Sequence, residues 1–191
     1  MGRLLEHDRC FRELKRLRHP PLIGSSPTPP RHEESNNRML ENNLTKLGLK
    51  LPEAAAPAAN YVPSVINNGV LYISGQLPLA DGKLVRTGKL GTEVSVEDGQ
   101  EAARHCALNI IAQTQRAIEG DWSRFDRIVK LSSFVNSAPD FAEHHLVTNG
   151  ASDLLVELLG DAGRHSRSAV GVANLPLNAS VEIEAIIALK G

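Results

Sequence analysis

The segment VEIEAIIAL at 181–189 constrains the fold most, because every second residue from Val181 onward is apolar, whereas the residues between them include two glutamates. Side chains on a β-strand point to opposite faces with a period of two, so this pattern predicts a strand with one buried face. That face is wholly apolar: Val181, Ile183, Ala185, Ile187 and Leu189. The other face is mixed and contains Glu182 and Glu184.

Periodicity alone favours exposure of both glutamates to water. A glutamate buried in an interface would need a partner, because an isolated buried charge is costly. Arg167 is a candidate partner if the two strands that flank NLPLNA fold back on each other.

The preceding sequence predicts an ordered series of strands and helices. SVINNGVLYISGQ at 64–76 has the pattern of a hairpin, since its Asn and Gly residues tolerate tight turns. A long helix should start after Ser95, where Asp98 completes a capping pattern, and should stop at Gly120. FDRIVKLSSFVNS at 125–137 is typical of a strand, and VTNGASDLLVELLG at 147–160 is typical of a helix.

The predicted order is strand, strand, helix, strand, helix, strand, strand. This α+β order favours two helices packed on one face of a mostly antiparallel sheet. Because two helices cover only one face, we expect a second chain to cover the other, as in an oligomer.

Composition bounds the domain and its partners. Residues 1–38 are rich in charge and proline, which predicts a disordered or non-native extension ahead of a single domain at 39–191. The start could alternatively lie at Met39. A net charge of -1 makes nucleic acid an unfavoured partner, and no apolar run approaches the ~20 residues of a membrane span. We expect a cytoplasmic protein, or a mitochondrial one if the extension is genuine.

Few residues suggest chemistry by their spacing alone. Ser74 and Gly75 follow an apolar strand, where they form either a simple turn or exposed backbone N–H groups that hold an anion. The pair His144 and His145 lacks the spacing of a zinc site, so we predict no metal. Cys106 lies on the core side of the long helix, where a buried and inert thiol is expected.

Two motifs nevertheless resemble a known family. YISGQLPL at 72–79 together with SRSAVGVANLPLNASVEIEAI at 166–186 is similar to the RidA family, also called YjgF. The resemblance spans about residues 60–191 in matching order. It implies a chorismate-mutase-like fold and homotrimers with ligand clefts between subunits. It also implies hydrolytic deamination of reactive 2-imino acids to 2-keto acids and ammonia, without a metal or a cofactor.

The resemblance also implies roles for single residues. Arg167 matches the arginine that binds the substrate carboxylate, and Glu182 matches the glutamate that positions the attacking water. Tyr61 and Ser74 have the family spacing of a cleft tyrosine and the serine of SGQ, and Gly75 joins them in the substrate-binding set. The family asparagine on the second helix corresponds to either of two positions: Asn149 or Ser152.

The sequence departs from the family pattern at two positions near Arg167. Ala169 replaces a common cysteine, and His165 stands where Pro or Ala is usual. These departures indicate a distinct branch of the family.

Other functions remain open at this point. The main alternative is a non-catalytic trimer that binds a small carboxylate through Arg167 and serves as a sensor or partner platform. An endoribonuclease, a label attached to parts of the family, is less favoured by the near-neutral charge. An isomerase would rest on fold analogy alone.

Overall fold

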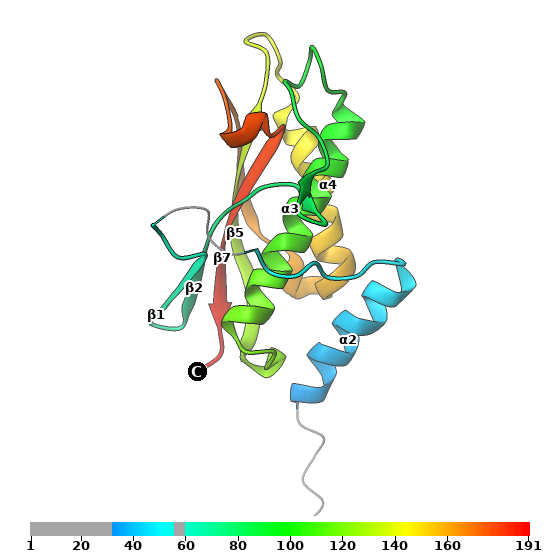
Figure 1. The fold of residues 1–191 in the computed structure, drawn as a ribbon. Coiled ribbons are helices and arrows are strands. Elements are labelled where there is room, and N and C mark those ends of the chain that lie inside the picture. Colours follow the sequence, from blue (N-terminus) through cyan, green and yellow to red (C-terminus); the bar gives the residue numbers. More distant parts are fainter. Residues whose placement is uncertain (1–31, 56–59) are drawn as a thin grey trace, which may run out of the picture. The chain divides into compact units, whose positions relative to one another are not determined.

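A computed structural model of the chain describes residues 32–55 and 60–191 (Figure 1). The predicted extension at 1–38 therefore lies largely outside the described residues. The elements, in chain order, are α2 (His32–Lys46), β1 (Ser64–Asn67), β2 (Val70–Gln76), β3 (Leu79–Ala80), β4 (Lys83–Leu84), α3 (Val96–Ala117), β5 (Phe125–Asn136), α4 (His144–Leu159), β6 (Ser166–Val172) and β7 (Val181–Leu189). Short 3-10 helices, η2 (Trp122–Arg124), η3 (Gly160–Gly163) and η4 (Pro176–Asn178), lie at the connections.

The main sheet has five strands in the order β1-β2-β7-β5-β6. Its strand pairs are antiparallel except for β5 and β6, which run parallel, so the predicted α+β fold with a mostly antiparallel sheet is confirmed. The condition for a direct partnership between Arg167 and the glutamates of β7 is not met, because the two strands that flank NLPLNA do not pair with each other. β5 lies between them and pairs with both, so the segment 173–180 crosses from one side of β5 to the other.

The β1–β2 hairpin turns where the sequence predicted it. Asn68 and Gly69 both have positive φ, at 50° and 74°, which is the backbone conformation that a two-residue hairpin turn requires. The strands on either side pair in register from Ser64 with Ile73 to Asn67 with Val70.

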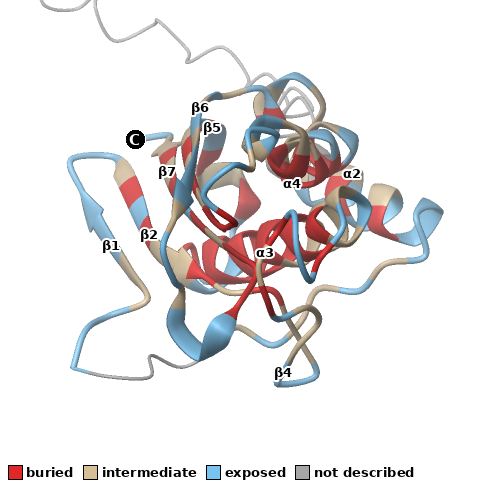
Figure 2. Cartoon of the chain, turned by 90° about the horizontal axis from the view of Figure 1, so that it is seen from above, coloured by how far each residue is buried: buried red, intermediate tan, exposed pale blue. Residues whose placement is uncertain are grey.

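Helices α3 and α4 pack against each other and on one face of the sheet, and the buried residues concentrate between these layers (Figure 2). Apolar residues recur at helical spacing along these two segments, and all of the following are buried: Ala103, Ala107, Ile110, Ile111, Ile118, Leu154, Leu155, Leu158 and Leu159. Ser95 caps α3 by accepting a hydrogen bond from the Asp98 amide at 3.1 Å.

The sequence predicted two helices, and α2 is an additional one. It begins at His32, ahead of the expected domain boundary, and packs on α4 and η2 rather than on the sheet. Leu40 and Leu44 are its buried apolar residues, and Asn43 donates to the Leu158 carbonyl at 3.0 Å. Its apolar residues are only Met39, Leu40 and Leu44, so the sequence carries a weak periodic signal for a helix here.

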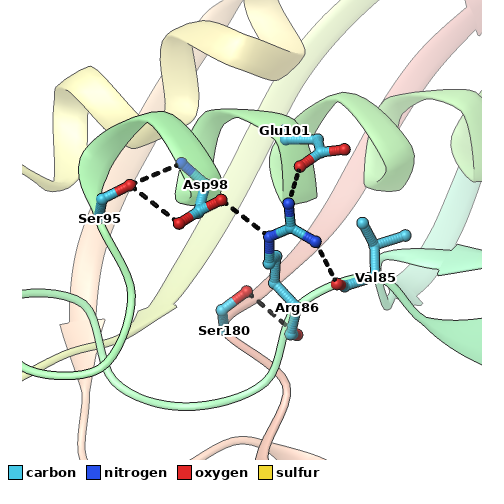
Figure 3. Close-up of polar contacts among 6 residues, drawn as sticks. All are labelled: Val85, Arg86, Ser95, Asp98, Glu101 and Ser180. Carbon is cyan, nitrogen blue, oxygen red and sulfur yellow. Dashed lines mark hydrogen bonds and ion pairs between the residues drawn. The ribbon is translucent and has the colours of Figure 1, made fainter.

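Polar contacts fasten the crossover from β4 to α3 (Figure 3). The Arg86 guanidinium pairs with Asp98 at 2.9 Å and with Glu101 at 2.6 Å, and it donates to the Val85 carbonyl. The Ser180 hydroxyl donates to the Arg86 carbonyl at 3.3 Å. Arg86 therefore ties the start of α3 to the segment that leads into β7.

The sheet face away from α3 and α4 is open in the single chain. Val65, Tyr72 and Val170 are exposed, and the pairing register places them on the same face as Ile186 and Phe134. Within the described residues, no helix is long and apolar enough to cross a membrane.

Candidate functional site

Arg167 lies on the edge strand β6 and is held by the facing helix α4. Its Nη1 donates to the Ser152 hydroxyl at 2.8 Å, and its Nη2 donates to the Asn149 side-chain oxygen at 2.8 Å and to the His145 carbonyl at 3.0 Å. A guanidinium has five N–H donors, so at least two of them have no partner among the described residues. The arginine is therefore oriented by neutral acceptors and retains donors for an anion.

The two candidate positions for the helix asparagine both contact the arginine. Asn149 and Ser152 lie three residues apart on α4, so they share one face of the helix, and each accepts a hydrogen bond from Arg167. The structure thus places both residues in the site, where the sequence offered them as alternatives.

Ser152 also joins Arg167 to His165. The Ser152 hydroxyl lies 3.0 Å from Nε2 of His165, and Nδ1 of the same ring lies 2.6 Å from the Gly163 carbonyl. Burial lowers the pKa of His165, and the charge of Arg167 acts in the same direction, whereas the Gly163 carbonyl raises it. The sequence marked His165 as unusual but gave no sign of this contact.

Glu182 lies on β7, on the open face of the sheet, and leans over β2. The register between β2 and β7 shifts between Ile73 and Gln76, which leaves Ser74 and Gly75 as a bulge opposite β7. A Cβ atom at position 75 would lie 1.9 Å from Oε1 of Glu182, so the carboxylate occupies the space left by the missing side chain.

The environment of Glu182 favours its protonated form. Burial raises the pKa of Glu182, and the neighbouring charge of Glu184 raises it further. Glu182 is half-buried, and among the described residues no hydrogen bond or ion pair to its carboxylate is present; Glu184 is exposed. A carboxylate with these properties is suited to accept a proton from water, because its pKa lies closer to neutrality than usual.

Ser74, which precedes Gly75 in the chain, holds the segment that follows Tyr61. The Ser74 hydroxyl donates to the Val62 carbonyl at 2.9 Å, and the Ser74 amide donates to the Pro63 carbonyl at 3.0 Å. These bonds fix the segment that carries Tyr61 against the end of β2. Tyr61 itself is 50% exposed, so its ring is available for contact.

Arg167 and Glu182 lie on opposite faces of the same sheet. Arg167 pairs with Leu131, which is fully buried beneath the helices. Glu182 pairs with Phe134 of β5. Phe134 follows Leu131 by three residues on that strand, so it lies on the opposite, open face of the sheet, and Glu182 lies there with it. Within one chain, the arginine group and the glutamate group therefore form two separate half-sites.

His144 and Cys106, which the sequence singled out, are held within the fold of the single chain. Nε2 of His144 lies 3.0 Å from the Ser137 hydroxyl, and its ring packs against Phe141. Burial raises the pKa of the Cys106 thiol well above its usual range. No group of three or more His, Cys, Asp or Glu residues that could hold a metal ion is present in the described part of the chain.

The fold is that of a chorismate-mutase-like protein. The family model described as "YjgF/chorismate_mutase-like, putative endoribonuclease" matches residues 41–188. The chain therefore belongs to the YjgF/RidA family, as the two motifs indicated.

Among relatives, Protein TCP17 of Trypanosoma cruzi is 52% identical over 149 residues, which cover 78% of this chain and 92% of that protein. A protein of unknown function from Agrobacterium tumefaciens, Atu1372, has a crystal structure with a TM-score of 0.78 and 48% identity; the match covers 83% of this chain and 98% of that one. A 2-iminobutanoate/2-iminopropanoate deaminase of Dermatophagoides farinae is 28% identical over 142 residues, or 74% of this chain and 95% of that protein.

Proposed function

We propose that the protein hydrolyses small 2-imino acids to 2-keto acids and ammonia in clefts between copies of the chain. The observation that carries the proposal is the half-buried Glu182, whose pKa is raised and whose carboxylate has no partner among the described residues. The relative that is named a deaminase supports the same chemistry.

The two half-sites would divide the reaction between them. The free N–H donors of Arg167 bind the substrate carboxylate, and Asn149 and Ser152 keep the guanidinium in place. Glu182 takes a proton from a water molecule as the water oxygen adds to the carbon of the protonated imine, and the C=N π electrons become the lone pair of the amino nitrogen. Glu182 then gives this proton to the nitrogen of the carbinolamine, which leaves as ammonia. The carbinolamine hydroxyl passes its proton to Glu182 as the C=O bond forms, and Glu182 releases that proton to solvent.

Assembly supplies the contact between the half-sites. Because Arg167 and Glu182 lie on opposite faces of one sheet, a shared cleft requires the arginine of one copy and the glutamate of another. The open face offers exposed apolar side chains, Val65, Tyr72 and Val170, for contact between copies. A closed homotrimer with three equivalent clefts is the assembly that we propose.

Imine hydrolysis tests the activity directly. An amino-acid oxidase generates 2-iminopropanoate and bulkier 2-imino acids, and semicarbazide traps the imine that remains. We expect the wild type to accelerate imine loss, and Arg167→Ala and Glu182→Gln to lower kcat/KM by at least tenfold while remaining folded, since a charged hydrogen bond contributes ~1.5–3 kcal/mol. Absence of acceleration with small, branched and aromatic substrates would refute the proposed activity.

Mixed oligomers test the shared cleft. Neither Arg167→Ala nor Glu182→Gln alone has a complete site, but a mixture of the two variants, unfolded and refolded together, restores a complete pair in about one cleft of four in a cyclic assembly. We expect the mixture to recover activity in that proportion. If the mixture stays as inactive as the separate variants, the two residues do not act in the same intersubunit cleft.

A binding protein without catalysis is the second candidate. The observation that favours it is the complete Arg167 group within one chain, which could hold a carboxylate without help from Glu182. Binding of pyruvate that survives in Glu182→Gln, together with no imine hydrolysis by the wild type, would support this function instead. Cleavage of RNA that persists in Arg167→Ala and co-purifies with the protein would indicate an endoribonuclease.

A further inference from the structure

The contacts around His165 allow a complete assignment of its hydrogen atoms. The Gly163 carbonyl can only accept, so Nδ1 of His165, 2.6 Å away, carries a proton. In the neutral ring Nε2 is then an acceptor, and the single proton of the Ser152 hydroxyl points to it across 3.0 Å. The same hydroxyl oxygen accepts from Nη1 of Arg167 at 2.8 Å.

The Ser152 hydroxyl therefore donates its hydrogen bond to His165 as long as the ring is neutral. If the ring gains a proton, Nε2 becomes a donor to the Ser152 oxygen, and the Ser152 O–H group no longer donates to the ring. The O–H group can then turn and donate to an anion that the neighbouring Arg167 binds. The ring would at the same time add a second positive charge near that anion.

We propose that His165 acts through Ser152 as a positioning residue of the Arg167 site, so that binding of a carboxylate turns the Ser152 hydroxyl toward the ligand and is coupled to uptake of a proton by His165. The inference rests on the proposed function in one respect, namely that Arg167 binds a carboxylate.

The charges near the ring determine the sign of the coupling. Asp153 lies next to Ser152 on α4 and is exposed, and in η3 Asp161 pairs with Arg164 at 3.1 Å. Arg167 is the charged group that lowers the pKa of His165, in addition to burial. A carboxylate on Arg167 offsets that positive charge, so the pKa of His165 rises when the ligand binds.

Linkage then fixes the effect on affinity. If ligand binding raises the pKa of His165, protonation of His165 strengthens ligand binding by the same factor. Each unit by which the pKa rises corresponds to about a tenfold gain in affinity at low pH. We expect the Kd of pyruvate to fall by about threefold to tenfold as the pH falls from about 7.5 to well below about 6.5, the ordinary pKa of histidine, because burial lowers the pKa of His165 in the free protein.

Calorimetric titration with pyruvate tests this proposal, in a Glu182→Gln background so that Glu182 does not titrate. Heats measured in buffers of different ionisation enthalpy report proton uptake. We expect uptake and tighter binding at low pH, the loss of both in His165→Gln, and a clear reduction of both in Ser152→Ala, where only the charge of the ring still acts on the ligand. His105→Gln is the matched control, because burial also lowers the pKa of His105, which lies on α3 outside the Arg167 group, and it should keep the full pH dependence.

The NMR signal of the His165 ring in the wild type gives a second measurement that needs no variant at this position, and its pKa should rise when pyruvate is added. Binding that is independent of pH, a pH dependence that persists in His165→Gln, or one that is undiminished in Ser152→Ala would overturn the coupling through Ser152 and leave the carboxylate site intact. If pyruvate does not bind at any pH, the carboxylate site and this inference both fail.

Discussion

The substitution Gly75→Ala should displace the Glu182 carboxylate without removing its charge. The added Cβ would lie 1.9 Å from Oε1, whereas ordinary contact begins at 3.4 Å, so Oε1 has to move by about 1.5 Å. A misplacement of about 1 Å in a catalytic group can cost about 10²-fold in rate. We therefore expect kcat/KM for 2-iminopropanoate to fall about 10²-fold in the semicarbazide assay.

Stability should change little in the same variant, because the Cβ meets the end of a flexible side chain rather than backbone. Alanine also lowers the entropy of the unfolded chain, which can add about 0.5–1 kcal/mol to the free energy of unfolding. Thermal denaturation measures this change. The pair Gly75→Ala and Glu182→Gln should be strongly non-additive in activity, since both act on one carboxylate. Full activity of folded Gly75→Ala would refute the position assigned to Glu182.

Three further predictions concern pH, stability and reactivity. The acid limb of kcat/KM should lie above the usual range of a glutamate and move to lower pH in Glu184→Gln, because Glu184 helps burial to raise the pKa of Glu182. Arg86→Ala should lower Tm at neutral pH and have little effect in strong acid. The hydrogen bond from Arg86 lowers the pKa of Asp98 below 3.8, so the stability that this bond contributes is lost as the pH falls through the lowered pKa. In a variant whose other cysteine is serine, Cys106 should react with a thiol reagent only as fast as the protein unfolds, since its thiol is fully buried.

The sequence predicted those parts of the fold in which local pattern and burial agree. The alternation along β7, the Ser95 cap and the Asn68–Gly69 turn each have a local physical cause, and each is present in the structure. Pairing between distant segments has no such local signal. The insertion of β5 between β6 and β7 therefore escaped the sequence analysis, although all three strands were predicted.

In the candidate site, too, the residues could be predicted from the sequence but their arrangement in space could not. Arg167 and Glu182 could be named from the family motifs, but the motifs do not reveal that they lie on opposite faces of the sheet. The bulge at Ser74 and Gly75, which makes room for the carboxylate, depends on a register shift that no single strand sequence encodes. The contact between Ser152 and His165 joins α4 to the start of β6 and becomes visible only in three dimensions.

The alternation along β7 separates two kinds of evolutionary change. Substitutions at 181, 183, 185 and 187 disturb the core beneath the helices, whereas those at 182, 184, 186 and 188 alter the open face. A lineage can therefore exchange residues of the second set, and with them its chemistry or its subunit contacts, while the folding of the single chain is preserved. In a comprehensive mutational scan, loss of protein abundance and loss of activity should alternate from one residue to the next along this strand.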